Sequence, residues 1–165
     1  TAEQYAKSIF DHFGFDSVTL NPYMGSDSIS PFLDRKEKGA FILCRTSNRS
    51  AKELQDKMVD GEPYYLHVAR FISGLNKSAN AGMVVGATAP EELQRIRDIA
   101  PDSPLLIPGV GAQGGDLSHS LRVGNQSGIG LINVSRGISF VGDMSEKSIH
   151  SAAANYVEQM RDILR

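Results

Sequence analysis

Glycines and polar side chains that could hold an anion are concentrated in the stretch "PGVGAQGGD", residues 108–116, which contains four glycines and Gln113. Successive glycines let a backbone approach an anion closely and take positive φ angles, and N–H groups at the start of a following helix can donate to it. We therefore interpret this stretch as a phosphate-binding loop that includes Pro108, Gly109 and Gln113. We expect Asp116 to cap the following helix, because a carboxylate would repel a phosphate.

A second candidate for anion binding follows the next apolar run, where "NVSRGI" supplies Ser135 and Arg136. A guanidinium offers a fork of N–H donors that matches two phosphate oxygens. Each motif has an ordinary alternative, since a glycine-rich turn is often only a tight connection and a single arginine is often a surface salt-bridge partner. If the two preceding strands are neighbours, however, the two motifs meet at one rim and favour a phosphate site.

Other polar residues have plain structural interpretations. By residue type alone, Ser47 in "TSN", Asn21 before a proline, and Thr1 before the first helix are turn or helix-start residues. Cys44 lies inside an apolar run without an activating partner, so we expect a small buried side chain. The histidines have no metal-ligand spacing, and we expect structural or exposed roles for His12, His67, His119 and His150.

Composition narrows the class of protein. With 165 residues, 41% hydrophobic and 22% charged, the chain is long enough for one core, and we expect a single domain over residues 1–165. A formal charge of −2 provides no general attraction to nucleic acid or to an anionic membrane. The single cysteine cannot form an internal disulfide, and no apolar run is typical of a membrane span or a signal peptide. We expect a cytoplasmic protein.

The apolar periodicity predicts strands that alternate with helices. The expected strands span residues 16–21, 39–45, 82–87, 103–110 and 130–136. The expected helices span residues 2–13, 88–100, a stretch near 117–123 and 145–165, with a short helix or turn over 26–33 and a mostly helical region from 50 to 80 whose longer part begins near Pro63.

Particular residues predict where the helices begin, end and face the core. Gly14 can end the first helix, and Thr88 with Glu91 has the spacing of a capping box. Helical spacing predicts that the buried side chains are Tyr5, Ile9 and Phe13 in the first helix and Ile149, Ala153 and Val157 in the last.

Strands that are apolar on both faces and separated by helices predict an α/β fold with a parallel sheet. Five strands permit two architectures: a complete open sheet, or five consecutive units of an eight-unit (β/α)₈ barrel. Both place ligands at the carboxyl ends of the strands. Functional residues are therefore expected in the segments that directly follow the apolar runs: "NPYMG", "RTSN", "GAT", "PGVGAQGGD" and "SRG".

The motifs "DSVTLNPYMGSDSISPF", "TSNRSA", "GMVVGATAPEELQRIR", "PGVGAQGGD" and "NVSRGI", in this order, resemble the orotidine 5'-monophosphate decarboxylase family, in its branch with an NPY-(L/M)-G strand end. The resemblance covers nearly the whole chain. It implies a (β/α)₈ barrel, a homodimer with active sites at the subunit interface, and catalysis without a metal or an organic cofactor. The implied ligands are orotidine 5'-monophosphate and uridine 5'-monophosphate.

The resemblance also implies roles for individual residues. The 5'-phosphate would be held by Pro108, Gly109, Gln113, Ser135 and Arg136. Ser47 would reach the pyrimidine base and meet Gln113 when the loop closes, and Asn21 would lie at the rim of the pocket. Thr1 would lie near the partner subunit's site.

The amino end departs from the family pattern. Family members carry an Asp-x-Lys-x-x-Asp-Ile motif shortly before a threonine that matches Thr1, so the catalytic Asp and Lys residues are expected upstream of Thr1. On this interpretation the chain holds barrel units four to eight, a carboxyl-terminal portion with the phosphate- and base-binding residues but no catalytic ones. Five strands cut from a barrel expose two edges, so we expect the segment alone to be an aggregation-prone monomer.

Two other functions stay open. Another phosphosugar decarboxylase on the same barrel, such as a keto-gulonate phosphate decarboxylase, would use a metal and different strand-end residues. A catalytically silent α/β module that binds phosphate would bind uridine monophosphate without turnover. Metal content and the base-facing "TSN" segment distinguish the first of these from the leading function, and measured turnover of orotidine monophosphate would exclude the second.

Overall fold

A five-stranded parallel sheet organises the chain. The computed structural model describes residues 1–111 and 113–165; Ala112, in the predicted phosphate loop, lies outside the described residues. The sheet has the order β1-β2-β5-β6-β7. Its strands are β1 (Ser17–Leu20), β2 (Gly39–Arg45), β5 (Ala81–Val85), β6 (Leu105–Pro108) and β7 (Gly130–Asn133). The predicted α/β class and the five predicted strands are confirmed.

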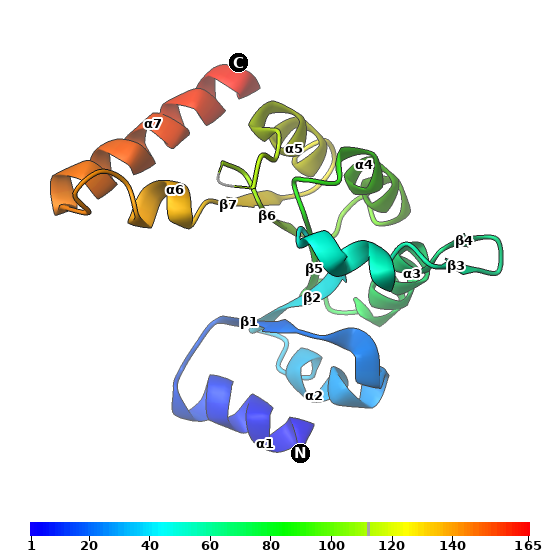
Figure 1. The fold of residues 1–165 in the computed structure, drawn as a ribbon. Coiled ribbons are helices and arrows are strands. Elements are labelled where there is room, and N and C mark those ends of the chain that lie inside the picture. Colours follow the sequence, from blue (N-terminus) through cyan, green and yellow to red (C-terminus); the bar gives the residue numbers. More distant parts are fainter. Residues whose placement is uncertain (112) are drawn as a thin grey trace.

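Helices lie beside the sheet across its whole width, from β1 at one edge to β7 at the other (Figure 1). They are α1 (Ala2–Ala6), which continues as a π-helix over Lys7–His12, α2 (Ser30–Leu33), α3 (Tyr64–Leu75), α4 (Pro90–Ile99), α5 (Leu117–Gly124), α6 (Arg136–Ser139) and α7 (Glu146–Leu164). Short 3₁₀ turns span Pro22–Met24, Ser26–Ser28 and Arg49–Glu53.

The core lies where the central strands meet α3, α4 and α5. Every residue of β5 is buried, in agreement with a strand covered on both faces. The edge strands β1 and β7 differ from the expectation of buried strands, because their side chains alternate between exposed and half-buried. An edge strand has a neighbour on one side only, so less of its surface is covered.

Arg97 connects the ends of two helices inside this core. The side chain is 1% exposed and comes from the last turn of α4. Its guanidinium donates to carbonyl groups at the carboxyl ends of α4 and α5, where helices leave carbonyls unpaired, and to carbonyl groups of the segment that follows α4. The acceptors are the backbone oxygens of Ala100, Pro101, Ser103, Val123 and Gly124.

The region from 50 to 80 contains a hairpin that the helical interpretation missed. Strands β3 (Met58–Val59) and β4 (Glu62–Pro63) pair in antiparallel fashion before α3 begins. Asp60 and Gly61 form the turn, with φ angles of 50° and 85°. An Asp-Gly pair favours such tight hairpin turns, so the signal was present in the sequence.

The first helix buries a different face from the predicted one. Of the three side chains predicted to be buried, Ile9 is half-buried, but Tyr5 and Phe13 are 62% and 64% exposed. The buried residues of this segment are Ala6 and Phe10, and Ile9 packs against them. Phe10 packs edge-on against Phe32 of α2, with ring centroids 6.0 Å apart. The helix widens into π geometry, in which the Phe13 N–H donates to the Ser8 carbonyl five residues back, and this breaks the expected spacing. Gly14, with φ 70°, follows its end as predicted.

Two details of other helices also differ. The predicted capping box is wrong: Ala89 precedes α4, and the Thr88 hydroxyl donates instead to the Ser47 carbonyl at 3.4 Å. In α7, Val157 is 44% exposed, and its neighbour Tyr156 packs against the core in its place.

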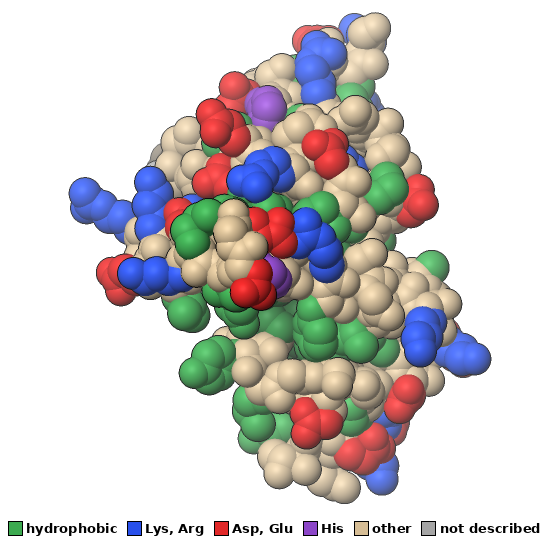
Figure 2. Space-filling view, turned by 90° about the vertical axis from the view of Figure 1, so that its right-hand side faces the viewer, with side chains coloured by type: hydrophobic (Ala, Val, Ile, Leu, Met, Phe, Trp, Pro, Cys, Tyr) green, Lys and Arg blue, Asp and Glu red, His purple; other side chains and the backbone are tan. Residues whose placement is uncertain are grey.

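The surface mixes both signs of charge. Figure 2 looks onto the side that carries the β3–β4 hairpin and shows Lys and Arg interspersed with Asp and Glu. Hydrophobic side chains gather in a groove below the hairpin, which corresponds to a cavity of about 290 Å³ between the turn at Pro22–Met24 and α3. Within the described residues, no helix combines the length and apolar character needed to cross a bilayer.

Candidate functional site

The glycine-rich loop leaves β6 in the conformation that its sequence predicts. Gly109, Gly111 and Gly114 have φ angles of 103°, 80° and 78°, a region that glycine enters without steric cost. The Gly114 N–H donates to the Gly111 carbonyl at 2.8 Å, and the Gly115 N–H donates to the Gly109 carbonyl at 3.0 Å. These two donors are therefore engaged within the loop.

Asp116 begins α5 as expected. Its Oδ1 accepts a hydrogen bond from the His119 N–H at 3.0 Å, which satisfies a free donor in the first turn of the helix. The carboxylate is therefore the N-cap of α5, as predicted.

Ser47 lies at the centre of the site, just beyond the end of β2. Two glycines leave room for it. A methyl group built on Gly86 would lie 2.7 Å from the Ser47 Cα, and one built on Gly109 would lie 3.1 Å from both the Ser47 Cβ and the Gln113 Oε1. Ser47 and Gln113 therefore approach the same glycine from two different loops. They also line one cavity of about 480 Å³, together with Arg45, Asn48, Arg49, Lys52 and Thr88.

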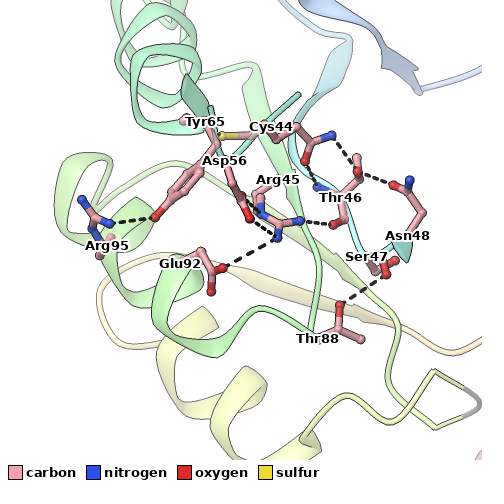
Figure 3. A network of polar contacts seen from close by, with 11 residues as sticks. Cys44, Arg45, Thr46, Ser47, Asn48, Asp56, Tyr65, Thr88, Glu92 and Arg95 are labelled. Carbon is pink, nitrogen blue, oxygen red and sulfur yellow. Dashed lines mark hydrogen bonds and ion pairs between the residues drawn. The ribbon is translucent and has the colours of Figure 1, made fainter. Parts of the chain in front are cut away.

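A polar network holds the segment around Ser47 (Figure 3). The side chain of Arg45 is 5% exposed; its Nε lies 3.0 Å from Asp56 Oδ1, and its Nη2 lies 3.7 Å from Glu92 Oε1. The Arg45 Nη1 donates to the Thr46 carbonyl at 2.8 Å. Gln55 makes two bonds to Thr46: its Oε1 accepts from the backbone N–H, and its Nε2 donates to Oγ1, each at 2.8 Å.

Ser135 and Arg136 lie at the neighbouring strand end. Pro108, the last residue of β6, is paired with Asn133, the last residue of β7, so the two predicted phosphate motifs leave adjacent positions of the sheet. Ser135 donates to the Asn133 side chain at 3.3 Å, and Arg136 is exposed at the start of α6. Both motifs are thus brought to one rim.

The phenol of Tyr156 lies behind the two motifs. A methyl group built on Gly111 would lie 2.7 Å from the Tyr156 hydroxyl, and one built on Gly137 would lie 2.8 Å from it. The hydroxyl therefore sits between the loop after β6 and the start of α6. No motif in the sequence identifies this residue, because its position depends on how α7 packs.

Asn21 and Thr1 are placed differently from this group. Asn21 follows β1, and its Oδ1 accepts from the Tyr23 N–H at 3.0 Å, so it acts as a turn residue as its type predicts. It also lines a cavity of about 140 Å³ to which Gln55 contributes. Thr1 lies at the start of α1, whose neighbour is α2, on the opposite side of β1 from the phosphate motifs (Figure 1).

Cys44 is buried, as predicted. Its Sγ donates to the Tyr65 carbonyl at 3.3 Å, and burial raises the pKa of the thiol to about 12. The thiol therefore stays protonated and is a poor nucleophile at neutral pH. Within the part of the chain that the structure describes, no three His, Cys, Asp or Glu side chains form a group that could hold a metal ion.

The comparisons with known proteins agree with the motifs. The sequence model of a protein family, described as "Orotidine 5'-phosphate decarboxylase / HUMPS family", matches residues 1–148. The chain is 44% identical over 167 residues to the orotidine 5'-phosphate decarboxylase of Janthinobacterium sp. (strain Marseille), covering 99% of this chain and 61% of that protein. It is 50% identical over 154 residues to that of Halorubrum lacusprofundi, covering 89% of this chain and 55% of the relative.

Solved structures show the same similarity. The chain matches Leishmania donovani UMP synthase with a TM-score of 0.89 and 42% identity, covering 98% of this chain and 36% of that one. It matches Leishmania donovani OMP decarboxylase with a TM-score of 0.83 and 36% identity, covering 98% of this chain and 62% of that one. These neighbours are TIM barrels, of which the five-stranded sheet is a part. The chain belongs to the orotidine 5'-phosphate decarboxylase / HUMPS family.

Proposed function

We propose that residues 1–165 form the phosphate- and base-binding half of an orotidine 5'-monophosphate decarboxylase. The observation that carries this proposal is the pairing of Pro108 with Asn133, which sets the glycine-rich loop beside Ser135 and Arg136. Because the chain spans 55% and 61% of the two curated relatives above, the activity is proposed for a longer polypeptide that contains it.

The residues have distinct proposed roles. Pro108, Gly109, Gln113, Ser135 and Arg136 hold the 5'-phosphate, with the Arg136 guanidinium supplying the positive charge. Ser47 faces the pyrimidine base and meets Gln113, which is supported by their common approach to Gly109. Asn21 lies at the rim, and Thr1 reaches towards the partner subunit's site in a homodimer.

The reaction needs groups beyond this part of the barrel. In the proposed reaction the bond between ring carbon six and the carboxylate breaks, carbon dioxide leaves, and a lysine donates a proton to the electron pair left on that carbon. We propose that the catalytic Lys and Asp belong to barrel units outside residues 1–165. Energy from phosphate binding, remote from the reacting carbon, closes the loops and positions the base.

The remaining proposals concern the whole protein. We propose that residues 1–165 are a single domain that forms an incomplete decarboxylase barrel. We also propose that the longer polypeptide is a cytoplasmic homodimer and that its reaction needs neither a metal nor an organic cofactor.

The test combines intact mass with activity on one purified sample. A mass well above 17.9 kDa together with conversion of orotidine monophosphate to uridine monophosphate is the expected result. Absence of orotidine monophosphate turnover, together with a divalent metal ion retained by the purified protein, would instead favour a metal-dependent phosphosugar decarboxylase. Tight binding of uridine monophosphate without turnover by the longer polypeptide would favour a silent phosphate-binding module.

A further inference from the structure

We propose that Gln55 is a positioning residue that acts through Thr46 to fix the orientation of Ser47. This inference rests on the proposed function, because the predicted consequence of losing the contact between Gln55 and Thr46 is weaker binding of the proposed ligand. Gln55 lies beyond the 3₁₀ turn Arg49–Glu53, and no motif of the sequence distinguishes it.

Three consecutive peptide groups around Ser47 are each held by a side chain. The Thr46 N–H, in the peptide that follows Arg45, donates to Gln55 Oε1 at 2.8 Å. The Thr46 carbonyl, in the next peptide, accepts from Arg45 Nη1 at 2.8 Å. The Ser47 carbonyl, in the third, accepts from the Thr88 hydroxyl at 3.4 Å. Since a peptide group is planar, fixing three planes in succession fixes the backbone dihedrals of Thr46 and Ser47.

Gln55 makes the most complete of these contacts. Besides accepting from the Thr46 backbone, it donates to Thr46 Oγ1 at 2.8 Å, and that hydroxyl donates to Asn48 Oδ1 at 2.5 Å. Both functional groups of the Gln55 amide are therefore used on a single residue. A side chain with one hydrogen-bonding group could make only half of this contact.

The backbone of Gln55 is itself anchored. Its N–H donates to the Ala51 carbonyl at 2.8 Å, and its carbonyl accepts from the Tyr65 N–H at 3.0 Å. Tyr65 is in the first turn of α3 and is buried. Through these hydrogen bonds, Gln55 links the Ser47 segment to the core helix α3.

The contact matters because Ser47 has little room to be misplaced. It fits against Gly86 and faces Gln113 across Gly109, and both approaches are close. If Gln55 is lost, the Thr46 peptide can rotate, and the Ser47 hydroxyl then leaves its position opposite Gln113. We infer a loss of ligand affinity on the base side of the site with little change in the fold.

A double-mutant cycle on the longer polypeptide tests this role. Gln55→Leu should weaken binding of uridine monophosphate about three- to tenfold, the range expected when the Ser47 hydroxyl loses its hydrogen bond to the ligand. In a Ser47→Ala background the same substitution should cause little further loss, because its effect passes through the Ser47 hydroxyl. Equal losses in both backgrounds would overturn the proposal.

Two further variants separate positioning from folding. Gln55→Glu keeps the acceptor for the Thr46 N–H, and the Thr46 hydroxyl can rotate to donate to the second carboxylate oxygen, so this variant should retain more affinity than Gln55→Leu. Gln94, also half-buried, bonds Asp98 and Gln126 on the surface, and Gln94→Leu should leave affinity unchanged. A Gln55→Glu variant as weak as Gln55→Leu would contradict the role.

The proposed function and this inference fail in different ways. If the unsubstituted polypeptide binds no uridine monophosphate, the proposed function is wrong and the inference falls with it. If it binds normally and Gln55→Leu binds equally well, only the inference is wrong. Thermal unfolding of each variant, measured in parallel, identifies a loss of affinity that follows from a loss of folded protein.

Discussion

The backbone of Ser47 packs directly against Gly86, so that a methyl group on residue 86 would lie 2.7 Å from the Ser47 Cα and 2.8 Å from its N. Real side-chain carbons do not approach backbone atoms this closely. The absence of a side chain at residue 86 is therefore a condition for the position of Ser47.

Gly86→Ala should displace Ser47 and weaken ligand binding. We expect a loss of about 1 to 3 kcal/mol in the free energy of unfolding, typical of overpacking, together with weaker binding of uridine monophosphate. Chemical denaturation and titration calorimetry measure the two effects. Gly74→Ala is the matched control: it lies within α3 with no atom within 4 Å of the added methyl, and it should be neutral or stabilising by up to about 1 kcal/mol. Equal effects of the two substitutions would contradict this explanation.

Gly137→Ala should clash with the Tyr156 hydroxyl, which would lie 2.8 Å from the new methyl group. Gly137 lies in α6 without a positive φ angle, so the strain comes from this contact and not from the backbone. We expect destabilisation of about 1 to 3 kcal/mol. In a Tyr156→Phe background the cost should fall, because the next ring atom is 3.5 Å away. A cost that is unchanged in the Phe background would show that the phenol is not responsible.

Arg136→Ala should remove the charge that binds phosphate. Once a ligand covers the guanidinium, losing one partner of the charge pair should cost about 2 to 5 kcal/mol in binding of uridine monophosphate. Binding of uridine, which has no phosphate, should change little. Arg161→Ala removes the same charge from the exposed surface of α7 and serves as the control. Unchanged affinity for uridine monophosphate in Arg136→Ala would reject the assigned role.

Cys44 should resist alkylation while the chain is folded. Burial raises the pKa of its thiol from 9.0 to about 12, so the folded state holds the proton at pH values where the unfolded state loses it. The resulting contribution to stability is fully present below pH 9 and is lost as the pH rises towards about 12. Iodoacetamide at about pH 8.5 should modify the Cys44 peptide only after denaturation, as read by peptide mass mapping. Rapid modification in native buffer would contradict this burial.

A comparison of unfolding free energies tests the same pKa shift independently. Between about pH 8 and pH 10.5, the native sequence should lose stability relative to Cys44→Ala, which has no thiol to titrate. Parallel pH profiles for the two proteins would mean that Cys44 titrates alike in the folded and unfolded states.

Local features of the sequence predicted much of the fold. Residues 39–45 form β2 with the predicted bounds, Gly14 ends the first helix in a left-handed conformation, and Asp116 caps α5. Each of these depends on the residue itself or on near neighbours: an apolar β-prone run, a glycine without a Cβ, a carboxylate three residues before an N–H. The Asp60–Gly61 turn is also specified locally, by a residue pair that favours tight hairpins.

The amino-acid sequence by itself determined the α/β class, the two donor-rich motifs and the family to which the chain belongs, because these reside in residue types, short spacings and motif order. Only the tertiary structure decided which polar groups bond or pack against one another. Thr88 bonds the Ser47 carbonyl instead of capping its helix, Gln55 holds Thr46, and Tyr156 lies between Gly111 and Gly137. These contacts join residues that lie far apart along the chain or across irregular turns, so they depend on how strands and helices pack, which local periodicity does not encode.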